Sequence, residues 1–201
     1  MKTRSDRPGE SDTVKPIHLI PLGNVGGTPG PGLDVLEHLA AKLARTFRTP
    51  CRIRPETFDL GFALDAGRNQ YYSTAILQRL ERASDPDARV LGVTAHDLFV
   101  PVLTFVFGEA QLDGNCAVVS LARLGEEFYG LPPRAELMRD RLVKEAAHEL
   151  GHTFGLRHCN DWRCVMSSSH GVERLDVKSA DFCPACRKPV QSSGYFTSIG
   201  L

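Results

Sequence analysis

An eleven-residue stretch with three histidines constrains the fold of this chain more than any other part of its sequence. It reads His148-Glu149-Leu150-Gly151-His152-Thr153-Phe154-Gly155-Leu156-Arg157-His158. Residues four apart lie on one face of a helix, so His148 and His152 can hold one metal ion. The helical period turns Glu149 by about 100° from His148. Glu149 therefore misses the metal but can reach a water molecule beside it.

The end of the same motif explains the third histidine. His158 follows His152 by six residues and would lie on another face if the helix continued. Gly155 can adopt the left-handed conformation that ends a helix and reverses the chain, so His158 can return as a third ligand. Three histidines and one open position are typical of a catalytic zinc site, where Glu149 takes and returns a proton. A bare H-E-x-x-H arises by chance, but five fixed positions argue against unrelated polar residues.

Four cysteines follow within 28 residues, and the last two form a C-x-x-C pair: Cys159, Cys164, Cys183 and Cys186. In a reducing compartment such a group is more often metal-binding than disulfide-bonded. Four thiolates suit a closed tetrahedral zinc site with a structural role. Adjacent residues of an extended segment point to opposite sides, so His158 and Cys159 could serve two metals. Two disulfides, free thiols or a redox C-x-x-C remain alternatives, although a redox pair usually opens a helix after a strand.

Composition and charge restrict the classes of partner. The 201 residues suffice for one domain with a substantial core. Lys+Arg and Asp+Glu balance at 24 each, which argues against nucleic-acid and anionic-membrane partners. No apolar run has the length of a membrane span. Residues 1–15 are polar and lack a signal-peptide core, so they predict a disordered leader on a cytoplasmic protein. Cys51 and Cys116 stand alone and are expected to be small buried apolar residues.

Apolar periodicity indicates an α/β fold. It predicts strands over residues 17–22, 51–54, 89–94, 103–107 and 117–121, with a turn over residues 108–114. Helical spacing predicts helices over residues 33–47 and 70–82, and a long helix from about residue 134 that carries the histidine motif. Strands alternating with helices are typical of an α/β sheet domain. The tail after Gly155 shows little periodicity and needs something other than a large core to order it.

The motif H-E-x-x-H-x-x-G-x-x-H-C, the later C-x-M and the distant C-x-x-C resemble the archaemetzincins, a family of metzincin-like zinc metallopeptidases. The resemblance implies a catalytic zinc on the three histidines, His148, His152 and His158, with Glu149 as general base. It implies a structural zinc on the four cysteines, Cys159, Cys164, Cys183 and Cys186, and hence two zinc ions per chain. Met166 would lie in the turn beneath the catalytic zinc, although a methionine read alone is more often core filler.

The resemblance also implies the fold. We expect a metzincin-like, mixed and roughly five-stranded twisted sheet packed on helices, with the active-site helix followed by a small zinc-stapled C-terminal subdomain. Residues 16–201 would form a single metallopeptidase domain, divided into a sheet-and-helix subdomain (16–154) and a zinc-binding subdomain (155–201). An extended substrate would pair with an edge strand near residues 103–107. His170 either approaches the cleft as a hydrogen-bond donor or is a solvated loop residue.

Two functional hypotheses from different classes remain. The first is a monomeric, active peptidase, possibly an aminopeptidase, that acts on peptide or protein substrates, short peptides among them. The second is a zinc-stabilised binding protein of the same fold with little or no turnover. Glu149 favours the first, because a binding protein needs no general base. A nucleic-acid-binding zinc finger is disfavoured by the neutral charge and by the lack of a basic helix after the C-x-x-C pair.

Overall fold

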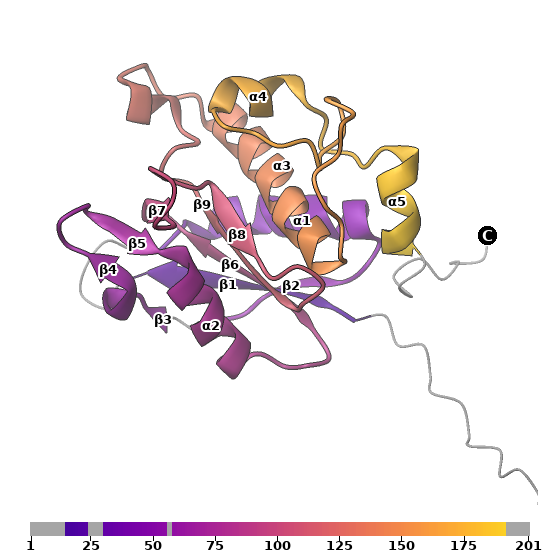
Figure 1. The fold of residues 1–201 in the computed structure, drawn as a ribbon, viewed down its shortest axis with the longest axis horizontal. Coiled ribbons are helices and arrows are strands. Elements are labelled where there is room, and N and C mark those ends of the chain that lie inside the picture. Colours follow the sequence, from indigo (N-terminus) through magenta and orange to yellow (C-terminus); the bar gives the residue numbers. More distant parts are fainter. Residues whose placement is uncertain (1–14, 24–29, 56–57, 192–201) are drawn as a thin grey trace, which may run out of the picture.

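The computed structural model describes residues 15–23, 30–55 and 58–191. A twisted sheet with helices on both faces forms its centre (Figure 1). The strands follow the order β2 (Cys51–Ile53), β1 (Ile17–Gly23), β6 (Arg89–Thr94), β9 (Cys116–Ser120) and β8 (Gly108–Ala110), and a short β3 (Phe58–Asp59) also pairs with β1. All pairs are parallel except β8 with β9. The expected mixed α/β sheet is therefore confirmed, with one short strand more than predicted.

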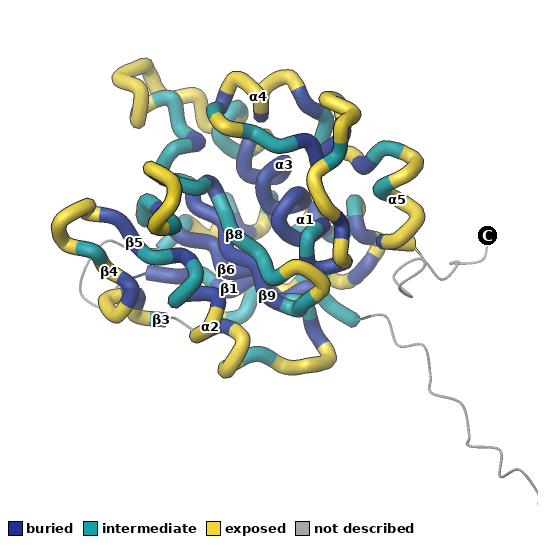
Figure 2. Tube along the Cα trace, in the orientation of Figure 1, coloured by how far each residue is buried: buried dark blue, intermediate teal, exposed yellow. Residues whose placement is uncertain are grey.

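The central strands bury both faces, which explains their nearly continuous apolar runs. Along β9, Ala117 and Val119 face one core, and Cys116 and Val118 face the other. Helices α1 (Leu33–Phe47) and α3 (Ala135–Thr153) cover the first face, and α2 (Ser73–Ala83) covers the second (Figure 1). Every residue of α3 from Arg141 to Gly151 is buried, so this helix lies inside the molecule (Figure 2). Sheet, α1 and the C-terminal segment together enclose it.

A small second sheet lies beside the first. Its strands are β4 (Leu64–Asp65), β5 (Gln70–Tyr72) and β7 (Leu98–Phe99), and the short 3-10 turns η1 (Gly61–Ala63) and η2 (Glu126–Tyr129) complete the connections. The prediction that a helix starts at Gln70 was wrong by three residues, since Gln70–Tyr72 pairs as a strand. The Gln70 amide explains this, because it donates to Asp97 and to the Thr104 carbonyl and holds β5 against the neighbouring loop.

The predicted strand over residues 103–107 is wrong. These residues form a loop, and only Val106 makes an isolated bridge, to Leu98. The edge strand is instead β8, within the segment that was predicted to be a turn. The apolar run misled the prediction because its side chains line a pocket and the core: Phe105 and Phe107 pack edge to face, 5.2 Å between ring centroids. The turn is confined to the segment after β8, where Asp113 has a positive φ of 58°.

The C-terminal segment adds helix α4 (Val172–Val177) beside α3 and, further along the chain, helix α5 (Pro184–Val190) (Figure 1). Its apolar residues join the main core, and Phe182 packs against Phe47 of α1 with ring centroids 5.6 Å apart. The tail is thus better packed than its sequence suggested, and its treatment as a subdomain from residue 155 stays a prediction. The predicted leader lies outside the described residues except for Lys15. Within the described ranges, no helix is long and apolar enough to cross a membrane.

Candidate active site and metal centre

The end of α3 brings three histidines together. His148 and His152 lie one turn apart on the helix, whose last residue is Thr153. Gly155 has a φ of +78°, and its N–H donates to the His152 carbonyl at 2.9 Å, so the chain reverses there. His158 then returns to the other two, with ring centroids 5.3 Å from His148 and 5.2 Å from His152. The left-handed glycine expected from the motif is therefore present.

Backbone carbonyls fix which nitrogens of these rings can bind metal. Nδ1 of His148 lies 2.8 Å from the Val165 carbonyl oxygen, and Nδ1 of His152 lies 2.7 Å from that of Leu156. A carbonyl only accepts, so both Nδ1 atoms carry the proton, and in a neutral ring Nε2 keeps a lone pair. The two Nε2 atoms lie 3.1 Å apart, close to the separation of about 3.3 Å that two ligands have around a tetrahedral zinc. Two facing lone pairs repel unless a cation lies between them, so this donor set fits a metal ion.

Burial shifts the pKa values of the histidines and glutamates at this site. Burial lowers the pKa of His148 well below its ordinary value, and the buried Lys178 ammonium lowers it further. The imidazole is therefore neutral, the form that binds metal. Burial raises the pKa of Glu149 well above the ordinary value, and the neighbouring Glu145 carboxylate raises it further. A cation held by the histidines would oppose this rise, because an opposite charge favours the ionised carboxylate.

The four cysteines converge at a second point. All four Sγ atoms lie within 4.8 Å of one another, and those of Cys159 and Cys183 are 3.9 Å apart. This exceeds a disulfide bond of about 2.05 Å and approaches the separation of about 3.8 Å expected in a tetrahedral zinc–thiolate site. The N–H of Cys183 donates to the Cys164 sulfur at 3.3 Å, and the N–H of Cys186 lowers the pKa of the Cys183 thiol. The C-x-x-C pair opens helix α5, which the sequence had not indicated.

One backbone segment, at Val165 and Met166, contacts both the histidine cluster and the cysteine cluster. The N–H of Cys159 donates to the Met166 carbonyl at 2.9 Å, next to the Val165 carbonyl that accepts the hydrogen bond from His148. Met166 is fully buried, and its sulfur lies so close to Gly151 that a side chain there would collide with it. The backbone at Val165 and Met166 thus contacts both the histidine and the cysteine cluster.

Three residues beside the site, Gly108, Glu145 and Lys178, were not predicted from the sequence. Gly108 on β8 faces Glu149, while Glu145 lies one helical turn before Glu149 and its carboxylate pairs with Lys178 at 3.7 Å. The position of Glu145, four residues before Glu149, could have placed it on the same helix face. No sequence signal joins Lys178 to Glu145, because the two are 33 positions apart in the chain.

His170, predicted either to approach the cleft or to be solvated, is exposed and lines the pocket beside Glu149.

An open sheet over α3, together with three histidines close enough to hold one metal ion and an adjacent glutamate, is the arrangement of a zinc metallopeptidase. The model described as peptidase family M54 matches residues 50–192. The chain is 41% identical over 183 residues to the archaemetzincin of Methanocaldococcus jannaschii, covering 91% of this chain and 97% of that protein. It therefore belongs to peptidase family M54, the archaemetzincins, as the sequence resemblance indicated.

Solved structures agree with this placement. The archaemetzincin of Methanopyrus kandleri superposes with a TM-score of 0.75 at 36% identity and covers 92% of this chain and 97% of its own. A zinc-dependent peptidase from Methanocorpusculum labreanum gives a TM-score of 0.77 at 30% identity, covering 87% of this chain and 99% of its own. The metzincin-like fold and the assignment as a zinc metallopeptidase follow from these relationships.

Proposed function

We propose that His148, His152 and His158 hold the catalytic zinc of this peptidase and that Glu149 is its general base. The two Nε2 lone pairs that face each other at 3.1 Å carry the proposal, since they call for a cation between them. The zinc ion, when bound, supplies a Lewis acid that makes water more acidic and polarises a peptide carbonyl. Glu149 holds the proton taken from water on its carboxylate and returns it to the departing amine nitrogen.

The four cysteines are proposed to hold a second, structural zinc, giving two ions per chain. Their sulfur atoms are close enough for one ion and leave no ligand position for water. Met166 would then occupy the Met-turn beneath the histidines, and Gly155 would be the helix-ending turn that lets His158 join them. The shared Val165–Met166 backbone supports a structural ion that holds the third histidine in place.

Peptide substrates are proposed to lie extended along β8, the edge strand of the main sheet that lies next to Glu149. Strand addition supplies main-chain hydrogen bonds, and Glu149 lies directly beneath this edge. The neutral total charge supports the absence of nucleic-acid and anionic-membrane partners. A monomeric state and a cytoplasmic location are part of the same proposal. An aminopeptidase action on short peptides, and a division of the domain after residue 154, belong to the same proposal.

The test compares the zinc-loaded protein with Glu149→Ala on a panel of peptides. Hydrolysis should fall by about 10²–10⁴-fold, whereas elemental analysis should still find two zinc ions per chain. Glu37→Ala, on the exposed side of α1, is the matched control and should cleave like the parent. Equal cleavage by Glu149→Ala would refute the mechanism. A parent protein that binds peptides but cleaves none would favour the zinc-stabilised binding protein instead.

A further inference from the structure

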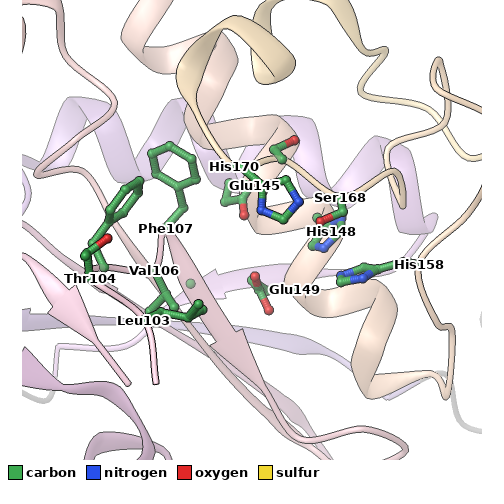
Figure 3. Close-up of a pocket in the computed structure, with 13 residues that line it drawn as sticks. Leu103, Thr104, Val106, Phe107, Glu145, His148, Glu149, His158, Ser168 and His170 are labelled. Atoms are coloured by element: carbon green, nitrogen blue, oxygen red, sulfur yellow. The ribbon is translucent and has the colours of Figure 1, made fainter. Parts of the chain in front are cut away.

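A cavity of about 330 Å³ opens beside Glu149 (Figure 3). Its walls come from three parts of the chain: residues 103–108, helix α3, and residues 168–170 after the Met166 turn. His148, Glu149 and His158 line it as well, so anything seated there adjoins the proposed reaction centre. Glu145 and Glu149 reach it from α3, with Leu103 and Phe107 across the cavity.

Glu145 lines this cavity and has a hydrogen-bond acceptor that no described donor uses. The residue is only 5% exposed, and its buried Oε2 atom has no hydrogen-bond partner among the described residues. The Lys178 ammonium lies 3.7 Å away, near enough to balance the charge but too far for a hydrogen bond, and it donates instead to the Ser167 carbonyl at 3.2 Å. A buried carboxylate oxygen without a donor is costly, so a ligand that donates to it would bind favourably.

The rest of the cavity suits the long aliphatic part of a ligand side chain. Phe105 and Phe107 contribute an aromatic wall, with Phe107 almost fully buried. The Arg123 guanidinium already covers one face of Phe105, 4.1 Å from the ring centroid, so the aromatic wall offers the ligand apolar packing rather than a site for its charge. Ser169, also at the cavity, has a buried hydroxyl without a partner in the described chain and could accept a further hydrogen bond. Lysine and arginine combine an apolar stem with a donor-rich head.

We propose that this cavity holds the side chain of a lysine or arginine next to the scissile bond, with its cationic head paired to Glu145. The proposal rests on the peptidase function proposed above and names its substrate preference. Glu145 and Glu149 would repel an acidic side chain in the same place. If Glu145 serves only to balance the buried Lys178 charge, substrate preference should not depend on it.

The first experiment uses the native zinc-loaded protein. Peptides that differ only in the residue before or after the scissile bond carry lysine, glutamate, or norleucine, which keeps the four carbons of the lysine stem but lacks its ammonium group. We expect kcat/KM to be about 10- to 100-fold higher for lysine than for norleucine at one of the two positions, the range of a charged hydrogen bond. Each peptide is tested with a free and an acetylated N-terminus. Equal rates for lysine and norleucine overturn the proposal, as does a preference that follows the free α-amino group.

The second experiment assigns the preference to Glu145. Glu145→Gln should reduce the lysine-to-norleucine ratio to within about threefold of unity, whereas the exposed control Glu37→Gln should keep the parent ratio. Because Glu145→Gln leaves the buried Lys178 charge unbalanced, the double variant Glu145→Gln/Lys178→Met is measured beside it and should lose the preference equally. An unchanged ratio in a folded, zinc-loaded variant overturns the assignment.

A binding measurement separates this proposal from the peptidase function. Fluorescence anisotropy of labelled lysine and norleucine peptides is measured on Glu149→Ala and on Glu149→Ala/Glu145→Gln, neither of which needs to turn over. Tighter binding of the lysine peptide that disappears in the second protein supports the pocket even if no peptide is ever cleaved. Cleavage by the parent without any lysine preference, in rate or in binding, leaves the peptidase function standing and overturns the pocket.

Discussion

A Cβ atom on Gly108 would lie 2.6 Å from the Cγ atom of Glu149, so edge strand β8 and helix α3 meet at a distance that only glycine allows. The same Cβ would lie 2.7 Å from the Val118 carbonyl oxygen, which is backbone and cannot turn aside. The Glu149 side chain would have to move, and strand β8 would have to shift slightly away from β9. The position of the proposed general base is thus set by the absence of a side chain on the opposite strand.

Gly108→Ala should therefore impair hydrolysis without unfolding the protein. A displacement of about 1 Å at a reacting group costs on the order of 10²-fold, so we expect kcat to fall by about 10- to 100-fold. Zinc content and circular dichroism should match the parent. Gly67→Ala is the control, because its nearest neighbour is the Asp65 carboxylate at 3.4 Å. Full activity of Gly108→Ala would mean that the position of Glu149 does not depend on this contact.

Gly151→Ala should destabilise the fold. Alanine in a helix normally gains about 1 kcal/mol over glycine, but overpacking costs about 1–3 kcal/mol. Here the new methyl group would meet the Met166 sulfur and lie 3.2 Å from the Phe182 ring, both buried. We expect the free energy of unfolding, measured by denaturant titration, to fall by up to about 2 kcal/mol. A double-mutant cycle with Met166→Val should show a loss smaller than the sum; strict additivity would remove Met166 as the cause.

Arg141→Lys should cost more stability than its conservative appearance suggests. The Arg141 guanidinium is 3% exposed and contacts both Asp176 oxygens and Glu126 Oε1 at 2.7 Å, which ties η2 and α4 to α3. Lysine cannot reproduce this forked geometry, and a broken buried pair costs about 3–5 kcal/mol. Because Asp176 is one-third exposed, we expect about 3 kcal/mol. Arg139→Lys, whose partners are exposed, should change the unfolding free energy by less than about 1 kcal/mol.

A mild chelator should remove the histidine-bound zinc first. That proposed site keeps an open position, whereas four thiolates enclose the other ion completely. Activity should disappear at a chelator concentration where circular dichroism is unchanged, since packing rather than metal buries α3. Zinc content, ellipticity and hydrolysis are followed in one titration. Loss of the cysteine-bound zinc first, or unfolding in step with the first ion, would contradict the division of roles.

Cys51 should resist alkylation at moderate pH. Burial raises the pKa of its thiol to about 12. At pH 8 the thiolate is therefore a very small fraction, and it is the thiolate that reacts with iodoacetamide. Labelling of Cys51 in the folded, zinc-loaded protein should be slow at pH 8 and should accelerate up to about pH 12. Peptide mapping after timed exposure provides the measurement, with the unfolded chain as the reference; rapid labelling of folded Cys51 would show that its pKa is ordinary.

The sequence predicted most where local spacing encodes geometry. The helix period and the turn at Gly155 place His148, His152 and His158 with no knowledge of the rest of the fold, and their convergence agrees. The prediction from the sequence failed at residues 103–107, because an apolar run suits a strand and a pocket wall equally well. It also missed the pairing of Glu145 with Lys178, which exists only once α4 has brought Lys178 beside α3. Contacts between distant segments carry the part of the site that sets substrate preference.

The order of the residues along the chain has a consequence for biosynthesis. All strands of both sheets precede residue 121, whereas the histidine and cysteine clusters come from residues 148–186. A nascent chain can therefore complete its sheet before any of these side chains has been translated. A chain that stops short of Cys183 contains all three histidines of the cluster but only two of the four clustered cysteines. On the assignments proposed above, the two zinc sites can therefore both be complete only after the chain has been extended past Cys186.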